Sequence, residues 1–355
     1  MSQIEKAEGL DAEGRHDDAI NELANAAQRG DVEATTRLAK RIIVGDRAPR
    51  LRREGIGLLR DAVRMGGAEA AARLAVIHAA GVFAAPDWPG ALRLAMLAAE
   101  RGWAPARAEL EVLESMIGLR AGAHADRPRG ERGARRFESL LEEDNLRLLL
   151  LPAPGAIVHE SPRIGRFPRF VSEPVCDWLI ERARGRLERA RVYDAYRKTD
   201  VVDESRTNSC AIFSAVEADL VHMMVQARMS VGCGQPMAHM EASTVLHYAA
   251  GESIGNHYDF VDPAHPGYRE EIRRFGNRVV TFLVYLNADY EGGETHFPRI
   301  GVTHVGRRGE GLFFVNTHPD GRPNEDTLHS GRPPTRGEKW VFSQFVRDRP
   351  EMSVP

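Results

Sequence analysis

The stretch VLHYAAGESIGNHYDF, residues 245–260, ends with a histidine and an aspartate two residues apart, His257 and Asp259. On a β-strand, residues i and i+2 project from the same face, so this imidazole and this carboxylate can converge on one ion. Taken alone the pair is weak evidence, because any strand rim can carry two alternating polar residues. Whether the pair binds a metal ion therefore depends on further candidate ligands elsewhere in the chain.

A third candidate ligand follows further along the chain. His329 lies in TLHSG, before a Pro-Pro turn and the strand-like run EKWVFSQFV. Two histidines and one carboxylate from two strands form the facial triad that holds non-haem Fe(II) and leaves coordination positions open. The lack of Cys ligands argues against a structural zinc site. The pattern therefore favours an oxidation catalyst in which a cosubstrate and O2 both reach the metal.

Lys339 stands ten residues after His329, in RGEKWVF. A cationic residue on the strand after the distal histidine is placed to pair with the far carboxylate of a dicarboxylate that chelates the metal. Lysine offers a point charge for this role, rather than the fork of arginine. A surface lysine at a strand end is the alternative, and only the combination with the triad favours the first interpretation.

Short strand-like runs separated by Gly, Pro and Asp surround these residues. They are STVLHYAA, RVVTFLVYLN, EGLFFVN and KWVFSQFV. In RVVTFLVYLN nearly every position is apolar, which predicts a strand covered on both faces of its sheet. Several short strands with this punctuation predict a sandwich or a barrel.

The first 115 residues have a different texture, rich in Ala, Leu, Arg and Glu, and they repeat. AAQRGDVEATTRLA, AVRMGGAEAAARLA and AAERGWAPARAELE begin 36 residues apart. Three sets of residues align across them: Gly30, Gly66 and Gly102; Ala34, Ala70 and Ala106; Leu38, Leu74 and Leu110. The pattern predicts helix pairs joined by a glycine turn, which stack into a solenoid because one pair cannot bury its apolar face alone.

Residues 5–115 resemble the Sel-one-like repeats, relatives of the tetratricopeptide family. The resemblance implies a protein-binding scaffold. An alternative remains open, in which the helices only cap and stabilise the second half. The Gly- and Arg-rich residues 118–136 look like a linker, and FESLLEEDNLRLLLL predicts one more helix before PAPG ends it.

Composition narrows the functional classes. The chain has 355 residues, a formal net charge of −3, and three cysteines without CxxC spacing, Cys176, Cys210 and Cys233. The charge gives no overall argument for a nucleic acid or an anionic membrane as partner. The Arg-rich linker is only weak evidence for contact with a nucleic acid or an acidic peptide. No run of about 18 apolar residues occurs, and the first residues lack the pattern of a signal peptide. We expect reduced cysteines and a cytoplasmic protein.

Residues 163–348 resemble the iron- and 2-oxoglutarate-dependent dioxygenases, specifically the prolyl 4-hydroxylase family. The motifs that carry the resemblance occur in order: PRIGRFPRFVSEPVCDWLIERA, SRTNSCAIF, VLHYAAGESIGNHYDF, RVVTFLVYLNADYEGGETHFP and GLFFVNTHPDGRPNEDTLHSGRPPTRGEKWVFSQFVR. The resemblance implies a double-stranded β-helix, or jelly roll, with flanking helices. The expected domains are the repeats at 1–115, a linker and helix at 116–160, and the dioxygenase at 161–355.

The resemblance also implies roles for single residues. The metal ligands for Fe(II) would be His257, Asp259 and His329, and Lys339 would pair with the C5 carboxylate of 2-oxoglutarate. Tyr248 would hydrogen-bond the same carboxylate and Thr281 would line its pocket, although both also fit ordinary core positions. O2 is the oxidant, succinate and CO2 are the co-products, and ascorbate supports activity. Glu294, in the glycine turn EGGETHF, is expected to be structural rather than catalytic.

Two positions depart from the family pattern on the substrate side. Ile254 stands where the family often has tyrosine, and Phe345 where it often has tryptophan. Arg206 either guides a substrate or structures its loop. The polar residues 193–205 are expected to form a mobile lid.

Three functions remain open on this sequence. The first is a peptidyl hydroxylase, most simply of proline, whose repeats recruit the target protein. The second is a hydroxylase of another peptide side chain or of a small molecule such as a natural-product precursor. The third is a non-catalytic scaffold, against which the intact triad and Lys339 argue.

Overall fold

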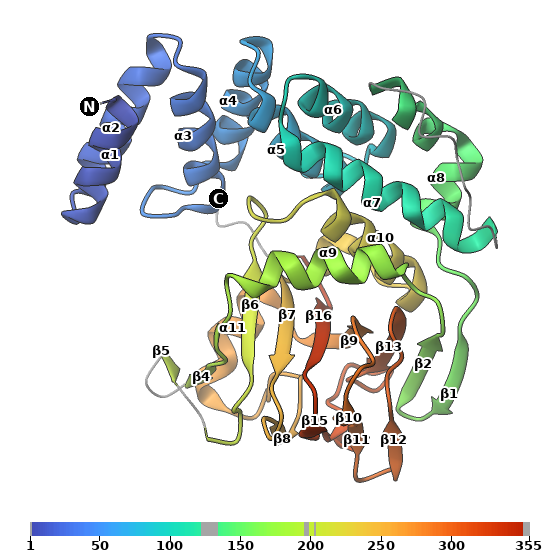
Figure 1. Cartoon of the computed structure of the whole chain (residues 1–355). Helices are drawn as coiled ribbons and strands as arrows, with labels where there is room; N and C mark the ends of the chain where they lie inside the picture. Colours follow the sequence, from blue (N-terminus) through green and yellow to red (C-terminus); the bar gives the residue numbers. More distant parts are fainter. Residues whose placement is uncertain (1, 122–133, 195–198, 202–203, 351–355) are drawn as a thin grey trace. The chain divides into compact units, whose positions relative to one another are not determined.

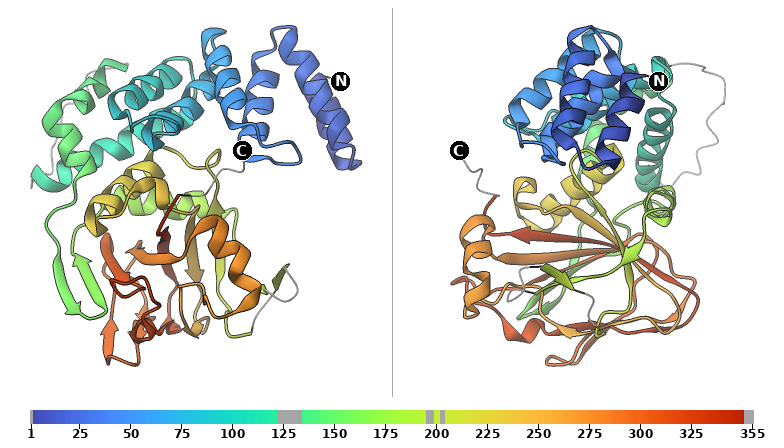
Figure 2. Two further views of the ribbon diagram at one scale, coloured as in Figure 1. Left: turned by 180° about the vertical axis from the view of Figure 1, so that it is seen from behind. Right: turned by 90° about the vertical axis from the view of Figure 1, so that its left-hand side faces the viewer.

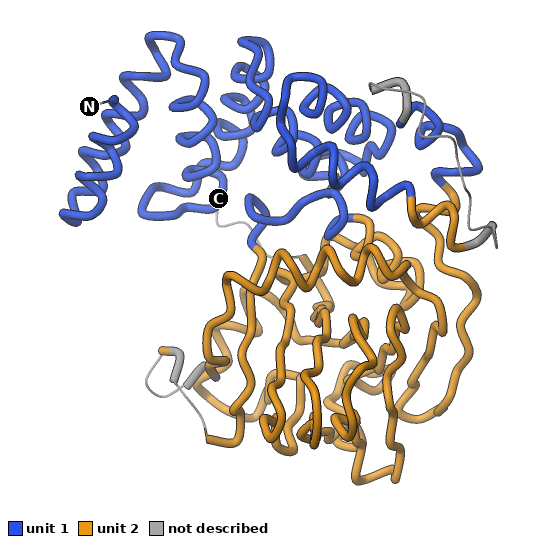
Figure 3. The backbone as a smooth tube through the Cα atoms, in the orientation of Figure 1, with its two compact units in different colours: residues 1–114, 124–146, 214–223 blue, residues 115–123, 147–213, 224–355 orange. Residues whose placement is uncertain are grey.

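The computed structural model describes residues 2–121, 134–194, 199–201 and 204–350. The chain forms two compact units, coloured separately in Figure 3. Unit 1 comprises residues 1–114, 124–146 and 214–223, and unit 2 comprises residues 115–123, 147–213 and 224–355. This division differs from the predicted domains, because part of the segment 116–160 falls in each unit and residues 214–223 join the helices.

Paired helices build unit 1 (Figure 1). The helices before residue 122 are α1 (Gln3–Ala12), α2 (His16–Gln28), α3 (Val32–Val44), α4 (Arg52–Arg64), α5 (Ala68–Ala80), α6 (Trp88–Glu100) and α7 (Ala104–Ala121), the last of which ends in unit 2. The first helices of the pairs begin at residues 16, 52 and 88, and the second helices at 32, 68 and 104, an interval of 36 residues each time. The predicted repeat and its period are confirmed.

The aligned glycines and alanines explain why the pairs close tightly. The turn within each pair contains a glycine with positive φ, at Gly30 (87°), Gly66 (98°) and Gly102 (89°). Glycine adopts this conformation without steric cost. The small residues four positions later are fully buried in all three pairs, at Ala34, Ala70 and Ala106. Small side chains at these positions let the helix backbones approach one another.

Residues 214–223 belong to unit 1 although they connect two elements of the oxygenase sequence, β6 (Ser209–Phe213) and α10 (Leu220–Cys233). Arg73 of α5 donates through Nη1 to the carbonyl oxygens of Val216 and Ala218, at 2.9 and 3.0 Å. The side chain of Val216 packs against the buried apolar cluster of the helix pairs. The helical unit thus fixes the backbone of this connection.

The predicted linker and helix are only partly described. Residues 122–133 of the predicted linker lie outside the described residues, and α7 continues into its first positions. The predicted helix is present as a 3₁₀ segment, Ala134–Leu141, followed by α8 (Glu143–Leu150).

Two antiparallel sheets form the body of unit 2, and their strands can be followed in Figures 1 and 2. The larger sheet has the order β1 (Ala156–Glu160), β2 (Arg163–Phe167), β13 (Glu310–Val315), β9 (Arg278–Tyr285), β16 (Lys339–Arg347), β7 (Ser243–Tyr248), β6 (Ser209–Phe213) and β3 (Glu188–Arg189). The smaller sheet has the order β12 (Val302–His304), β11 (Thr295–Phe297), β14 (His329–Gly331) and β8 (Ile254–His257). The predicted double-stranded β architecture is therefore confirmed.

Smaller elements complete unit 2. Two short ribbons pair β10 (Glu291–Gly292) with β15 (Pro334–Arg336), and β4 (Val192–Asp194) with β5 (Thr199–Val201). The remaining α-helices of the described residues are α9 (Glu173–Arg184), α10 and α11 (Arg269–Phe275). None of the helices in the described ranges has both the length and the apolarity that crossing a bilayer requires.

The strand β9 lies at the centre of the core and is buried on both faces, as its apolar sequence predicted. One face contributes Leu283 and Tyr285 to a cluster with Phe297 of the smaller sheet. On the opposite face Phe282 stacks against Phe167, with ring centroids 5.9 Å apart. Tight packing on both sides fixes the orientation of the polar residues that share these strands.

All three cysteines are free thiols, as the sequence predicted. Burial raises the pKa of Cys176 to about 12 and that of Cys233 to about 11. Thiols that stay protonated in this way are poor nucleophiles and poor metal ligands.

Candidate active site

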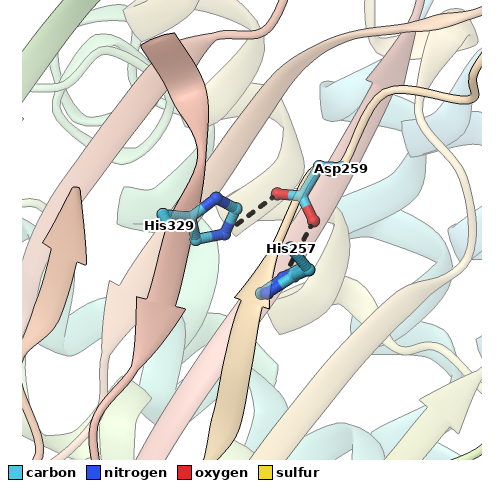
Figure 4. A group of neighbouring side chains, drawn as sticks. All are labelled: His257, Asp259 and His329. Atoms are coloured by element: carbon cyan, nitrogen blue, oxygen red, sulfur yellow. Dashed lines mark ion pairs between the residues drawn. The ribbon is translucent and has the colours of Figure 1, made fainter. Parts of the chain in front are cut away.

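His257, Asp259 and His329 converge at the end of the smaller sheet (Figure 4). His257 is the last residue of β8, His329 is the first of β14, and the two are paired across the antiparallel ladder. Nε2 of His257 lies 3.4 Å from Oδ1 of Asp259, and Nε2 of His329 lies 3.5 Å from Oδ2. Within the described ranges, this is the group of His, Cys, Asp and Glu side chains whose ligand atoms all lie within 4.8 Å of one another.

Backbone carbonyls fix which ring nitrogen of each histidine faces the carboxylate. Nδ1 of His257 lies 2.9 Å from the carbonyl oxygen of Gly255, and Nδ1 of His329 lies 3.0 Å from that of Thr327. A carbonyl only accepts, so both rings carry their proton on Nδ1. The lone pair of each Nε2 is then directed at the space beside Asp259, as a metal ligand requires.

The electrostatics of the group favour an anionic carboxylate at Asp259. Burial alone would raise the pKa of Asp259, but His329, His257 and a hydrogen bond from Thr281 together hold that pKa well below its usual range. Burial and the neighbouring His257 together lower the pKa of His329 to about 4, against the opposing effect of Asp259. The carboxylate of Asp259 and Nε2 of His329 are thus deprotonated at neutral pH, as metal binding needs.

A chain of two hydrogen bonds orients Asp259. The hydroxyl of Thr281 donates to Oδ2 of Asp259 at 2.7 Å, and Nδ2 of Asn316 donates to the hydroxyl oxygen of Thr281 at 3.0 Å. All three residues are buried. Thr281, predicted from the sequence to line the cosubstrate pocket, thus has its proton committed to the carboxylate of the triad.

The donor set fits Fe(II). Two imidazole nitrogens and one carboxylate on one side leave the opposite side of an ion open, and no thiolate is part of the described group. His257 keeps a quarter of its side chain exposed, whereas Asp259 and His329 are almost fully buried. Solvent therefore reaches the group from the side of His257.

Lys339 is a buried cation without a counter-ion. It is 2% exposed, and no carboxylate of the described residues lies within ion-pair distance of it. Its ammonium nitrogen lies 5.1 Å from the ring centroid of Tyr248 and 5.6 Å from that of Tyr285. Burial lowers the pKa of Lys339 to about 8, partly opposed by the charge of Glu294. A desolvated cation of this kind is a binding position for an anion.

Tyr248 faces Lys339 because the strands β7 and β16 pair these two residues. Its ring is buried, and burial raises its pKa. A Cβ added to Gly331 of β14 would lie 3.3 Å from the hydroxyl oxygen of Tyr248, so this glycine leaves room for the hydroxyl. The geometry is compatible with the predicted cosubstrate contact.

The glycine turn EGGETHF has the predicted conformation. Gly292 and Gly293 have φ angles of 72° and 70°. Both are in the left-handed region that favours glycine. The charge of Glu294 raises the pKa of Lys339, and its structural rather than catalytic role stays a prediction.

The residues predicted on the substrate side, Arg206, Ile254 and Phe345, differ in their burial and in their contacts. Arg206 forms a β-bridge to Ile254, and the chain beside it is tied by a 2.8 Å bond from the N–H of Gly255 to the carbonyl of Ser205. Ile254 is 5% exposed and offers a substrate little surface. Phe345 is half-buried, with the guanidinium of Arg278 3.9 Å from its ring centroid.

The predicted lid, residues 193–205, is only partly within the described ranges. Residues 195–198 and 202–203 lie outside them, and the flanking pieces pair as β4 and β5. The lid therefore stays a prediction.

Sequence reasoning missed Asn316 and Tyr285. Tyr285 could have been predicted, because it lies four residues after Thr281 on β9 and so shares its face. Asn316 gave no signal, since it follows a strand in an irregular segment and only the folded chain brings it to the site.

Comparison with known proteins identifies the family. A model described as the 2OG-Fe(II) oxygenase superfamily matches residues 243–347, the range that contains the triad and Lys339. The chain is 30% identical over 215 residues to "Probable prolyl 4-hydroxylase 9" of Arabidopsis thaliana, covering 55% of this chain and 72% of that protein.

Two solved structures are also similar to parts of this chain. A viral collagen prolyl hydroxylase from Paramecium Bursaria Chlorella virus-1, in complex with 2OG, is 26% identical with a TM-score of 0.40 and covers 52% of this chain and 94% of its own. A Sel1 repeat protein from Oxalobacter formigenes is 14% identical with a TM-score of 0.31 and covers 39% of this chain and 71% of its own.

The sequence match spans the strands that carry the buried triad and the buried lysine. The Arabidopsis relative is matched over most of its length. The chain belongs to the 2OG-Fe(II) oxygenase superfamily and is a prolyl 4-hydroxylase-like enzyme that uses iron and 2-oxoglutarate.

Proposed function

We propose that this enzyme hydroxylates a proline side chain within a protein, and that its helical repeats recruit that protein. In this proposal Fe(II) binds to His257, Asp259 and His329, and the distal carboxylate of 2-oxoglutarate binds to Lys339 and Tyr248. The observation that carries the iron site is the convergence of the ligand atoms of two histidines and one aspartate within 4.8 Å of one another. The observation that carries the cosubstrate site is the buried charge of Lys339, which lacks an ion-pair partner among the described residues.

The chemistry divides between the bound groups and the chain. Iron and 2-oxoglutarate supply the oxidation: one atom of O2 enters the substrate as a hydroxyl and the other enters succinate, with loss of CO2. The chain binds and orients. Its two histidines present Nε2, Thr281 and Asn316 hold the carboxylate of Asp259, and Lys339 fixes the far end of the cosubstrate. Fixed geometry of this kind is the main contribution of a protein to such a reaction.

Support for proline comes from the relatives, because the Arabidopsis protein is named as a probable prolyl 4-hydroxylase. Support for a protein substrate comes from the repeats, since stacked helix pairs present extended surfaces suited to protein partners. The buried Ile254 and the phenylalanine at position 345 differ from the family's substrate side. Another peptide side chain or a small molecule is therefore the alternative that the experiment must separate.

The test of the substrate is mass spectrometry of host-proteome peptides incubated with the Fe(II)-loaded protein and 2-oxoglutarate, with His329→Ala as the control. A gain of one oxygen on proline in a restricted set of proteins, absent with the variant, is the expected result. Succinate formation without any marked peptide would replace the peptidyl substrate by a small molecule. No succinate formation at all would overturn the enzymatic proposal.

Recruitment is tested on the marked protein rather than by deleting the repeats, because residues 214–223 belong to the helical unit and would lose their partners. If the repeats recruit the target, kcat/KM for the intact protein exceeds kcat/KM for its isolated proline peptide. Equal values for both would contradict recruitment while leaving the proline assignment intact.

A further inference from the structure

The hydroxyl of Tyr290 is a buried polar group without a partner. Its oxygen is sealed from solvent and makes no hydrogen bond with the described residues, although the residue as a whole is only partly buried. A buried hydroxyl left unpaired costs free energy, so native proteins rarely keep one without a reason. A ligand that supplies the missing partner is such a reason.

The ring of Tyr290 and the stem of Lys339 both lie close to Gly293. A Cβ added to Gly293 would lie 2.9 Å from Cε2 of Tyr290 and 3.3 Å from Cδ of Lys339, so the tyrosine ring and the lysine stem pack against the same glycine. The left-handed glycine turn, with φ of 70° at Gly293, brings both side chains together. Any side chain at this position would separate them or displace the ring.

The ammonium of Lys339 lies near the rings of Tyr248 and Tyr285. The hydroxyls of Tyr285 and Tyr290 differ in their hydrogen bonding. The hydroxyl of Tyr285 is bonded to that of Thr295 at 2.8 Å, so it already has a protein partner. The hydroxyl of Tyr290 has none among the described residues. Tyr290 is close enough to the phenols of Tyr248 and Tyr285 to raise the pKa of each, so the three tyrosines are neighbours.

We propose that Tyr290 is a cosubstrate-binding residue whose hydroxyl donates a hydrogen bond to the distal carboxylate of 2-oxoglutarate beside Lys339. The proposal rests on the proposed function, because it assumes that this carboxylate pairs with Lys339. The cation neutralises the carboxylate, and the phenol supplies a directed O–H donor. The pair selects a 2-oxo acid with a second carboxylate over one without it.

The alternative is that Tyr290 only fills space with its ring. The substitution Tyr290→Phe separates the two roles, because it keeps the ring against Gly293 and removes the hydroxyl alone. If the hydroxyl is a ligand-binding group, the ligand-free variant should melt at the same temperature as the wild type or higher, because the substitution removes a buried, unpaired hydroxyl. The same variant then binds 2-oxoglutarate more weakly. A space-filling ring predicts no change in binding.

The experiment measures melting temperatures and binds two probes to the full chain loaded with Mn(II), by isothermal titration calorimetry. The probes are 2-oxoglutarate and pyruvate, which has the 2-oxo acid but lacks the second carboxylate. For Tyr290→Phe we expect ~10-fold weaker binding of 2-oxoglutarate, the loss of one hydrogen bond to a charged group. Binding of pyruvate is expected to stay unchanged.

Two control variants make the outcome unambiguous. Tyr285→Phe leaves the hydroxyl of Thr295 without its partner and is expected to lower the melting temperature, opposite to Tyr290→Phe. Lys339→Ala is expected to abolish binding of 2-oxoglutarate. Wild-type affinity in Tyr290→Phe together with loss in Lys339→Ala would overturn the role of Tyr290 and leave the proposed function standing. Wild-type affinity in Lys339→Ala would overturn the proposed cosubstrate site itself.

Discussion

His329 lies directly opposite His257 in the β14–β8 ladder, with the two ring centroids 4.3 Å apart. The register of one strand pair therefore sets the distance between two of the three proposed ligands. A slip of one residue would turn one imidazole to the other face of the sheet. Since a backbone carbonyl also anchors Nδ1 of each ring, the orientation of both imidazoles is fixed by the protein itself.

Loss of His329 should abolish metal binding without unfolding the protein. We expect that His329→Ala removes measurable Fe(II) or Mn(II) affinity, because the carboxylate and one imidazole alone hold these ions weakly. The matched control is His296→Ala on the adjacent strand β11, whose imidazole is bonded to Thr303 outside the triad. Calorimetric titration with Mn(II) measures both variants. Equal metal affinity in His329→Ala and in the wild type would move the metal site elsewhere.

The bond from Thr281 to Asp259 should tune metal affinity rather than cosubstrate affinity. Thr281→Val removes the hydroxyl that orients the carboxylate and leaves Nδ2 of Asn316 without its acceptor. Loss of such an outer partner typically weakens metal binding by ~10-fold or more. Thr281→Ser retains the hydroxyl and should stay close to the wild type. If Thr281→Val instead weakens binding of 2-oxoglutarate at saturating metal, Thr281 belongs to the cosubstrate pocket, as its sequence context indicated.

Much of this enzyme could be predicted from order and spacing. The helical repeat was visible because glycine, alanine and leucine recur every 36 residues, and the structure places the helices at the same interval. His257 and Asp259 were visible because residues i and i+2 of a strand share one face of a sheet. His329 and Lys339 were visible through their order and spacing along the chain.

The parts that escaped prediction depend on three-dimensional proximity. Asn316 acts on Asp259 only through Thr281, and 35 residues of sequence separate Asn316 from Thr281. Tyr290 and Lys339 are far apart in the sequence, and the fold brings the ring of one and the stem of the other against Gly293. Residues 214–223 look like any connection in the sequence, and their place among the helices follows from the bonds to Arg73. No sequence period or motif predicts such contacts.

Arg73 should contribute to stability through that connection. Arg73→Ala leaves the carbonyls of Val216 and Ala218 without the donor that satisfies both. An unpaired, partly buried acceptor costs ~1 kcal/mol or more, so the free energy of unfolding should fall by about that amount. Urea denaturation followed by circular dichroism measures the change, with Arg93→Ala at an exposed position of α6 as a control for loss of charge alone. Equal stability of the two variants would show that the connection does not depend on Arg73.

Binding of 2-oxoglutarate should weaken as the pH rises through about 8, the pKa to which burial lowers Lys339. Below this pH the lysine is a cation that attracts the distal carboxylate. Above it the ligand-free enzyme must first take up a proton, so affinity falls by up to ~10-fold for each further pH unit until the higher pKa of the complex is reached. Calorimetry of the Mn(II)-loaded protein between pH 7 and pH 9.5 measures the slope, and buffers of different ionisation enthalpy report the proton uptake. Lys339→Arg keeps its charge throughout this range, so its affinity, even if lower, should not vary in this way. An identical slope in Lys339→Arg would assign the pH dependence to another group, and a flat profile in the wild type would mean that Lys339 does not pair with the cosubstrate.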